Sequence, residues 1–218
     1  MKISEIFYSL QGEGRSIGVP TIFVRFGCCN LVCNFCDSKY AFVGEEKTEE
    51  QVLQKIYSYL PCKKICFTGG EPLFQRDSLK ALIERLLPLG YVIEIETNGS
   101  IAPPKSLIEN NNIFWNVSPK LSNSGNDLKD SLVPEVLKSF NQASNTIFKF
   151  VIGSEEDFKE VKDLVKDFNL NSIYLMPEGI LDADIREKAS WIVEKCKESN
   201  FNFSPRLHVW LWEGRRGV

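Results

Sequence analysis

Residues 29–36 read Cys-Asn-Leu-Val-Cys-Asn-Phe-Cys and place Cys29, Cys33 and Cys36 in the spacing C-x3-C-x2-C. Three thiolates this close together can hold three irons of a cubane [4Fe–4S] cluster, whereas an electron-transfer cluster of this type is held by four cysteines. One iron would then lack a protein ligand. An open metal position is a place where a small molecule can bind and react. The stretch therefore predicts an open iron–sulfur site.

Two other interpretations of these cysteines stay open. A structural zinc site needs four Cys or His ligands, usually as two separated pairs, but the chain has one histidine, His208, and no second C-x2-C pair. The thiols could also be incidental. Because Cys28 precedes Cys29, the spacing C-x4-C-x2-C can be read as well. We take Cys29 as the first ligand.

The remaining cysteines are expected to be structural. Cys62 and Cys66 flank the start of a predicted strand, where alternate residues point to opposite faces, so we expect buried or half-buried thiols. Cys196 lies in a predicted helix. A disulfide framework is not expected, because the chain is long enough to build a core and its cysteine count, 7, is odd.

Composition narrows the class of protein. A chain of 218 residues with 43% hydrophobic residues suits one domain over residues 1–218. The formal net charge of −3 offers no basic surface for nucleic acid. No apolar run approaches the roughly 18 residues of a membrane span, and the first residues do not resemble a signal peptide. Free cysteines without an export signal indicate the reducing cytoplasm.

Alternating patterns predict an α/β fold. Runs rich in β-branched and aromatic residues predict strands over residues 21–26, 64–68, 91–96, 113–117, 146–152, 172–176 and 206–211. Segments with a 3.6-residue period predict helices over residues 49–60, 77–87, 154–168 and 182–196. In the clearest of these, Ser154 supplies an N-cap and an acidic first turn follows. Strand–helix alternation is typical of a parallel sheet with covering helices.

Polar and glycine-containing motifs follow several predicted strands. They are Gly69-Gly70-Glu71-Pro72, Thr97-Asn98-Gly99, Ser118-Pro119-Lys120 and Pro177-Glu178-Gly179. Because the carboxyl ends of parallel strands form the binding face of α/β sheets and barrels, we expect these motifs to meet there. The polar segment 120–134 is predicted to be a loop, either inert surface or a lid over the site.

These motifs together resemble a known family. The pattern Cys-x3-Cys-x-aromatic-Cys, with Phe35 before Cys36, resembles the signature of the radical S-adenosylmethionine (SAM) superfamily. Residues 7–15, Phe-Tyr-Ser-Leu-Gln-Gly-Glu-Gly-Arg, and the order of the later motifs resemble its deazapurine-forming branch, which serves queuosine biosynthesis. The resemblance extends from residue 7 to about residue 179.

The resemblance implies a fold and a reaction. The fold is a partial (β/α) barrel with about six parallel core strands. The reaction converts 6-carboxy-5,6,7,8-tetrahydropterin to 7-carboxy-7-deazaguanine by radical ring contraction with loss of ammonia. It also implies an external electron donor and a homodimer.

The resemblance also implies which residues bind the cofactors. Cys29, Cys33 and Cys36 would hold the [4Fe–4S] cluster, and the Ser38 hydroxyl would bind Mg²⁺. The residues implied to contact SAM are Phe35, Asp37, Gly70, Glu71, Thr97, Asn98, Ser118, Pro119, Lys120, Met176, Pro177 and Glu178. Some have simpler explanations: the glycines and Asn98 suit ordinary turns, and Met176 suits core packing.

Leu10, Gln11, Gly12, Glu13, Arg25, Thr68 and His208 form the implied substrate-binding set. Arg25 interrupts an apolar run, where a charge is costly unless paired, so we expect it to bind the substrate carboxylate. An internal ion pair with a glutamate is the alternative. His208 lies in a predicted strand, where a structural histidine is the usual case.

Two other functions remain open from the sequence. A glycyl-radical-enzyme activating enzyme would share the cysteine motif but consume SAM and act on a large protein partner. A binding module that holds an iron–sulfur cluster or zinc would have no catalytic role. Neither alternative is excluded by spacing alone.

Overall fold

The computed structural model describes residues 1–213 and 215–218. Within them, nine strands form one sheet in the order β3-β1-β2-β4-β5-β6-β7-β8-β9. Their bounds are β1 Lys2–Leu10, β2 Pro20–Phe26, β3 Glu45–Glu46, β4 Lys64–Gly69, β5 Val92–Thr97, β6 Ile113–Val117, β7 Thr146–Ile152, β8 Ile173–Pro177 and β9 Asn202–Phe203.

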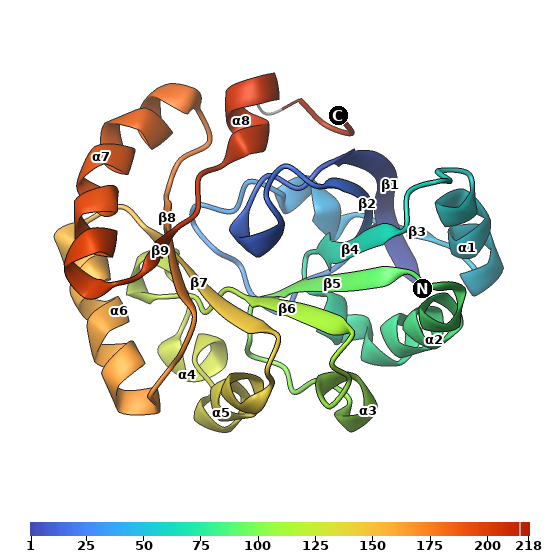
Figure 1. The fold of residues 1–218 in the computed structure, drawn as a ribbon, viewed down its shortest axis with the longest axis horizontal. Helices are drawn as coiled ribbons and strands as arrows, with labels where there is room; N and C mark the ends of the chain where they lie inside the picture. Colours follow the sequence, from blue (N-terminus) through green and yellow to red (C-terminus); the bar gives the residue numbers. More distant parts are fainter. Residues whose placement is uncertain (214) are drawn as a thin grey trace.

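The sheet is the open, partial barrel that the family resemblance implies. All neighbours from β2 to β9 pair in parallel, and β2, β4, β5, β6, β7 and β8 are its six longer parallel strands. β1 joins β2 antiparallel, and the two-residue β3 joins β1. Figure 1 shows the sheet curved into an open arc, with β3 and β9 as its unjoined edges.

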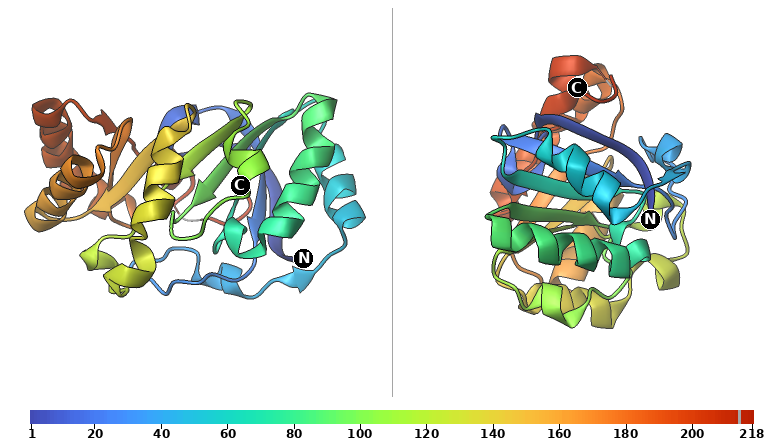
Figure 2. Two further views of the ribbon diagram at one scale, coloured as in Figure 1. Left: turned by 90° about the horizontal axis from the view of Figure 1, so that it is seen from below. Right: turned by 90° about the vertical axis from the view of Figure 1, so that its right-hand side faces the viewer.

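Helices cover the outer side of this curl. The α-helices are α1 Glu49–Tyr57, α2 Arg76–Leu86, α3 Lys105–Ile108, α4 Leu128–Ser131, α5 Pro134–Gln142, α6 Glu155–Phe168, α7 Asp182–Ser199 and α8 Leu207–Trp212. Short 3₁₀ helices are η1 Gly14–Ser16, η2 Lys39–Phe42, η3 Pro72–Gln75, η4 Leu87–Leu89 and η5 Ser122–Ser124. Figure 2 shows the longer helices packed side by side along the sheet. Among the described residues, no helix combines the length and hydrophobicity needed to cross a membrane.

Helix α6 begins where the sequence predicts it. The Ser154 hydroxyl accepts a hydrogen bond from the Asp157 backbone N–H at 3.2 Å, and the Asp157 carboxylate accepts one from the Ser154 N–H at 3.1 Å. This reciprocal capping box satisfies two N–H groups that the helix itself cannot pair. Asn169, in the left-handed conformation with φ of 50°, ends the helix.

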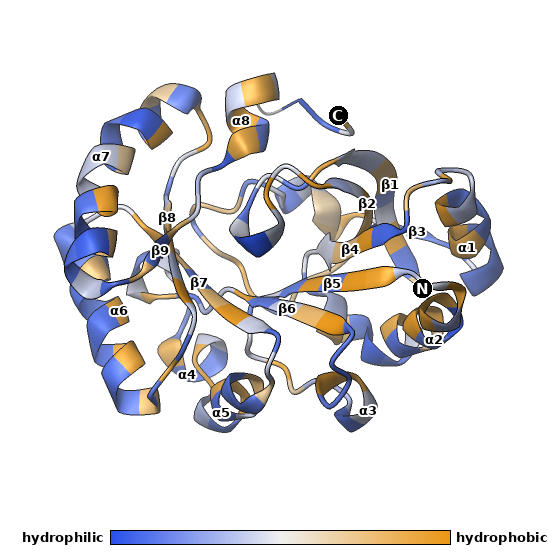
Figure 3. Cartoon of the chain, viewed as in Figure 1, coloured by the Kyte–Doolittle hydropathy of each residue, from blue (hydrophilic) through white to orange (hydrophobic). Residues whose placement is uncertain are grey.

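The main core lies between the sheet and these helices. In Figure 3 the strands are largely hydrophobic and the helices carry hydrophobic stripes among hydrophilic residues. One contact typifies it: the Trp115 ring of β6 packs on the Phe140 ring of α5, with 5.2 Å between ring centroids and 59° between ring planes. Both side chains are buried. This packing fixes the strands whose carboxyl ends carry the motifs.

Three local predictions were wrong or incomplete. The strand predicted over residues 206–211 is instead α8, because Val209 and Trp210 donate backbone hydrogen bonds to the Arg206 carbonyl and Leu207 donates to the Gly12 carbonyl. Residues 2–10, for which no strand was predicted, form β1. The segment predicted as the loop 120–134 contains η5 and α4.

The substitution Phe140→Ala tests the core contact. Removing a fully buried ring leaves a cavity, so we expect a loss of about 3–5 kcal/mol in the free energy of unfolding. Chemical denaturation measures it. The control Phe74→Ala removes a ring that is 54% exposed and is expected to cost about 0.5 kcal/mol. Equal losses for the two variants would contradict the packing described.

Candidate functional site

A cavity of about 420 Å³ opens at the carboxyl ends of the parallel strands. Every residue of the predicted substrate set lines it, and so do Ser38 and Cys29, Cys33 and Cys36. Of the predicted SAM contacts, Phe35, Asp37, Gly70, Thr97, Asn98, Ser118, Lys120, Met176 and Glu178 also line the cavity, whereas Glu71, Pro119 and Pro177 do not. The fold therefore brings most of the predicted site together.

The three cysteines of the cysteine loop line this cavity, and two of their sulfurs accept hydrogen bonds. The Leu31 N–H donates to Cys29 Sγ at 3.5 Å, and the Asn126 side-chain amide donates to Cys33 Sγ at 3.2 Å. Cys28 does not line the cavity; it has a left-handed backbone with φ of 69°, and its carbonyl accepts from the Glu71 N–H. Burial raises the pKa of the Cys29 thiol to about 11.

The loop packs directly on the turn after β4. A Cβ atom at Gly70 would lie 1.9 Å from the Cys28 carbonyl oxygen and 3.0 Å from Cys29 Cβ. At Gly69, where φ is 138°, a Cβ would lie 2.2 Å from the Phe26 carbonyl oxygen. Only residues without a side chain allow this approach. The two glycines therefore set the position of the first cysteine.

The segment 120–134 supports the other end of the loop. The Asn34 N–H donates to the Ser124 carbonyl at 2.9 Å, and the Val32 N–H donates to the Asn126 side-chain oxygen at 2.9 Å. Neither of the two sequence-based alternatives, inert surface or lid, describes this role. The segment 120–134 instead supports the cysteine loop through these hydrogen bonds.

The donor set fits a cluster with three protein ligands. The other described cysteines, Cys28, Cys62, Cys66 and Cys196, do not line the cavity, and Cys62, Cys66 and Cys196 are the buried or half-buried thiols that the sequence predicts. His208 does line it but lies beside the N-terminal loop: a Cβ at Gly12 would lie 2.1 Å from its Nδ1. The structure thus offers three cysteines at one cavity, two of them with N–H donors to sulfur, the donor set that a cubane cluster with one open iron requires.

Glu71 ties two strand ends together. Its buried carboxylate accepts hydrogen bonds from the Leu73 N–H at 3.0 Å, the Thr97 hydroxyl at 2.8 Å and the Asn98 N–H at 2.6 Å. Burial raises its pKa even though these donors oppose the shift. The geometry therefore gives Glu71 a positioning role between the turns after β4 and β5.

Lys120 is a cation on the same side of the cavity as Cys29 and Cys33, since its charge acts on both thiols. Its ammonium donates to the Ser118 hydroxyl at 2.8 Å, and burial lowers its pKa. A half-buried cation with one neutral partner is suited to an anionic ligand, because the ligand's charge would offset the cost of burial.

Gln11 shapes the N-terminal loop. Its amide nitrogen donates to the carboxylates of Glu94 at 2.9 Å and Glu96 at 3.2 Å, while its oxygen accepts from the N–H groups of Gly12 at 2.8 Å and Glu13 at 3.3 Å. All of these partners belong to the protein. The side chain therefore holds the loop in place.

Arg25 forms the internal ion pair that was the alternative to substrate binding. Its Nε donates to Glu5 at 2.7 Å, and the hydroxyl of Tyr40 donates to the same carboxylate oxygen at 3.0 Å. The Nε pairing orients the guanidinium at the cavity wall. An ion pair on one edge of a guanidinium leaves its other edge available for a second carboxylate.

Glu13 lies at the centre of a charged group that the sequence did not reveal. Its carboxylate pairs with Lys149 and with Arg206 Nε at 3.2 Å, and it lies 3.8 Å from His208 Nε2. Burial would raise the pKa of Glu13, but the charges of Lys149 and Arg206 outweigh it and lower the pKa far below its ordinary 4.5. Glu13 is therefore ionised and shared among cations.

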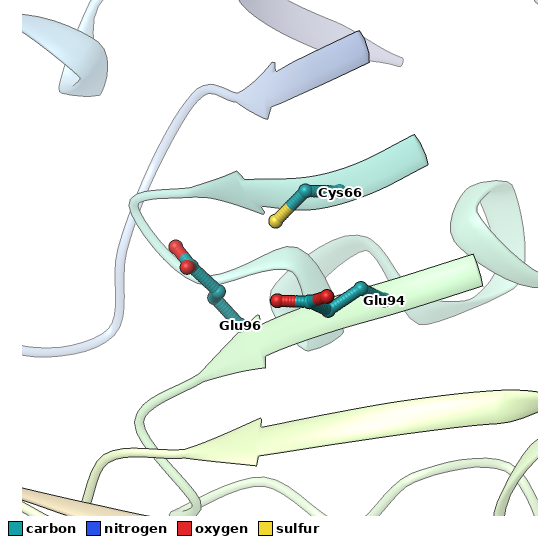
Figure 4. A group of neighbouring side chains, drawn as sticks. All are labelled: Cys66, Glu94 and Glu96. Carbon is teal, nitrogen blue, oxygen red and sulfur yellow. The ribbon is translucent and has the colours of Figure 1, made fainter. Parts of the chain in front are cut away.

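A polar floor lies deeper in the barrel, where Cys66, Glu94 and Glu96 have ligand atoms within 4.8 Å of one another (Figure 4). Glu94 is fully buried and accepts from Asn116 at 2.5 Å, and Lys64 lies 2.6 Å from its other oxygen. Glu96 accepts from the Thr68 hydroxyl at 2.7 Å. Lys64 offsets the charge of Glu94, and the amides of Gln11 and Asn116 and the Thr68 hydroxyl donate to the two carboxylates, so the group serves as a hydrogen-bonded floor.

Some functional residues were missed although the sequence pattern marks them, and one is not marked by the sequence at all. Lys149, Glu94 and Glu96 are charges within hydrophobic strands, the same signal that drew attention to Arg25. Arg206 could not be noticed in this way, because it stands at the end of the predicted strand 206–211 and does not interrupt it.

Comparisons with known proteins point to one family. The family model described as the radical SAM superfamily matches residues 23–192. A 7-carboxy-7-deazaguanine synthase of Pyrobaculum aerophilum is 34% identical over 100% of this chain and 97% of its own length. One of Hyperthermus butylicus is 33% identical over 96% of this chain and 92% of its own length. Among solved structures, that of QueE from Escherichia coli has a TM-score of 0.72 at 25% identity and covers 95% of this chain and 94% of its own.

The substitution Gly70→Ala tests the seating of the cysteine loop. The added methyl group would meet a backbone carbonyl, so the loop must shift, and we expect iron affinity after anaerobic reconstitution to fall at least about tenfold. Iron per chain measures it. Gly18→Ala is the control: the methyl group meets no atom within 4 Å, so this variant carries only the strain of a left-handed backbone, which Gly70 does not have. Full iron loading of Gly70→Ala would contradict the packing.

Proposed function

Because this chain belongs to the radical SAM superfamily and, within it, to the family of the 7-carboxy-7-deazaguanine synthases, we propose that it converts 6-carboxy-5,6,7,8-tetrahydropterin to 7-carboxy-7-deazaguanine with loss of ammonia. The observation that carries the proposal is one cavity lined by both the three cysteines and the whole predicted substrate set. An enzyme that activates a large protein would need its radical site open to a macromolecule. A pocket of about 420 Å³ suits a small heterocycle.

Membership of the superfamily implies a [4Fe–4S] cluster and SAM. When bound, the two supply an adenosyl radical that can abstract a hydrogen atom from the substrate. The residues present fit both groups: Cys29, Cys33 and Cys36 would hold the cluster, and Thr97, Ser118 and Met176 line the same cavity.

The protein's first task is to hold the cofactor. Lys120 supplies a cation for its carboxylate, held in place by Ser118. Asn98 is anchored to the cysteine loop, since its amide donates to the Asn30 side chain at 2.9 Å. Glu71 fixes the backbone of Asn98 relative to the turn after β4. These contacts give the cofactor site a rigid frame, which is what proximity effects require.

The second task is to orient the pterin. We assign its carboxylate to the free edge of the Arg25 guanidinium, whose other edge is fixed by Glu5. We assign its hydrogen-bonding edge to the backbone of Leu10 and Gly12, because Gln11 and Glu13 are occupied by protein partners and hold that backbone. Thr68 and His208 complete the wall.

A magnesium ion would complete the site. Ser38 follows the cysteine motif, lines the cavity and donates to Asp37 at 2.9 Å. A hydroxyl oxygen and a substrate carboxylate are hard ligands of the kind that Mg²⁺ prefers, and magnesium usually takes few ligands from the protein. We therefore assign Ser38 as its protein ligand.

The surroundings of the enzyme are also part of the proposal. We propose one radical SAM domain over residues 1–218, working in the cytoplasm as a homodimer with an external one-electron donor. Seven free cysteines suit a reducing compartment. The dimer and the donor rest on the family resemblance.

A product assay tests the activity. Reconstituted protein, reduced with dithionite and supplied with SAM, Mg²⁺ and the carboxypterin, is expected to release deazapurine and ammonia in equal amounts without net consumption of SAM. Cys33→Ser should abolish product, because the cluster loses a ligand, while Cys62→Ser, which lies outside the cavity, should keep it. Chromatography with mass detection measures the product. Absence of deazapurine from the wild type would refute the activity.

The magnesium assignment has its own test. Ser38→Ala removes the hydroxyl, so we expect the Mg²⁺ concentration for half-maximal activity to rise about tenfold, whereas Ser38→Thr keeps a hydroxyl and should stay near the wild type. Titration of activity with Mg²⁺ distinguishes them. Identical curves for all three proteins would remove Ser38 from the metal site.

A further inference from the structure

Arg206 joins the three segments that build the active site. Its Nε donates to Glu13 of the N-terminal loop at 3.2 Å. One terminal nitrogen donates to the Gly179 carbonyl, just beyond β8, and the other donates to Asp37 of the cysteine loop. Each nitrogen of the guanidinium thus binds a different part of the chain, and the residue is 7% exposed.

Within the sheet, these segments are linked only through the whole run of strands from β1 to β8. The N-terminal loop follows β1, near one edge of the sheet, whereas β8 lies next to the opposite edge strand. Hydrogen bonds close the gap: the Leu207 N–H donates to the Gly12 carbonyl at 3.0 Å, and the Gly14 N–H donates to the Ser204 hydroxyl at 2.8 Å. The open side of the barrel is therefore closed by the residues around Arg206.

Charge explains why this position suits arginine. Two anions, Glu13 and Asp37, face two cations, Arg206 and Lys149, so the group is balanced. A guanidinium is planar and presents its donors in a fixed fork, so it can bind three acceptors at defined directions. A lysine ammonium is a single point of charge and cannot span the same three segments.

We propose that Arg206 is a positioning residue that sets the distance and orientation between the cysteine loop, the N-terminal loop and the end of β8. This inference rests on the proposed function for its meaning in catalysis, since those segments hold the cluster, the pterin and the cofactor. Its structural part is independent of that function.

The first test uses the protein without cluster or cofactor. Amide hydrogen exchange is compared in wild type, Arg206→Gln, Arg206→Lys and the control Arg186→Gln, which alters an exposed arginine paired with Asp182 on α7. We expect amide exchange in residues 11–14 and 33–38 to accelerate at least about tenfold in both Arg206 variants, because these segments open more often when the Arg206 contacts are lost. Residues 76–86 of α2 should be unchanged in all four proteins.

The second test uses the reconstituted enzyme. Because a displacement of about 1 Å can cost about a hundredfold in rate, we expect kcat for the pterin to fall at least about tenfold in the Arg206 variants, with the SAM destroyed per product formed rising. Arg186→Gln should match the wild type. A purely structural role would lower the amount of active protein but leave the SAM destroyed per product unchanged.

The outcomes separate the two proposals. Wild-type exchange in residues 11–14 and 33–38 of the Arg206 variants would overturn the positioning role, and so would equal acceleration along the whole chain or an unchanged ratio of SAM destroyed to product. If the wild type makes no deazapurine but the exchange pattern is as expected, the assigned reaction fails while the structural part of the inference stands.

Discussion

The site depends on a buried carboxylate that must be paired. A curled sheet leaves its edges unjoined, and in this chain the N-terminal loop fills the gap with Glu13, whose side chain is 13% exposed. A charge taken out of water is costly unless partners offset it. Lys149 and Arg206 offset it from the far side of the barrel, so the same interaction that neutralises Glu13 also fixes the loop that faces the substrate.

Around that pairing the cavity is built by polar side chains that mostly bind one another. Gln11 and Glu71 each hold neighbouring segments together through several hydrogen bonds. Ser124 and Asn126 accept hydrogen bonds from the cysteine loop and hold it in place. Such networks rigidify a site when every member has its partners. Among the residues that line the cavity, the three cysteines, Lys120 and Arg25 are suited to a cluster and to carboxylates.

Sequence patterns predicted the parallel strands and the meeting of motifs because each depends on local information: hydrophobic runs, capping by Ser154, and motifs at strand ends. Contacts between residues far apart along the chain could not be predicted from such local patterns. Arg206 and Asp37 are 169 positions apart along the chain, and residues 206–211 alternate like a strand yet form α8 once Leu207 bonds to Gly12. Glu94, Glu96 and Lys149 were visible as charges in hydrophobic strands, but their partners were not.

The central claim is that three cysteines leave one iron open for a small molecule. Electron paramagnetic resonance of the reduced, reconstituted protein tests it most directly, with spectra recorded before and after SAM is added. The account predicts a [4Fe–4S]⁺ signal whose g values shift on addition of SAM and, with isotope-labelled SAM, hyperfine coupling to its amino nitrogen. A signal that SAM leaves unchanged, or iron coordinated by a fourth side chain, would contradict it.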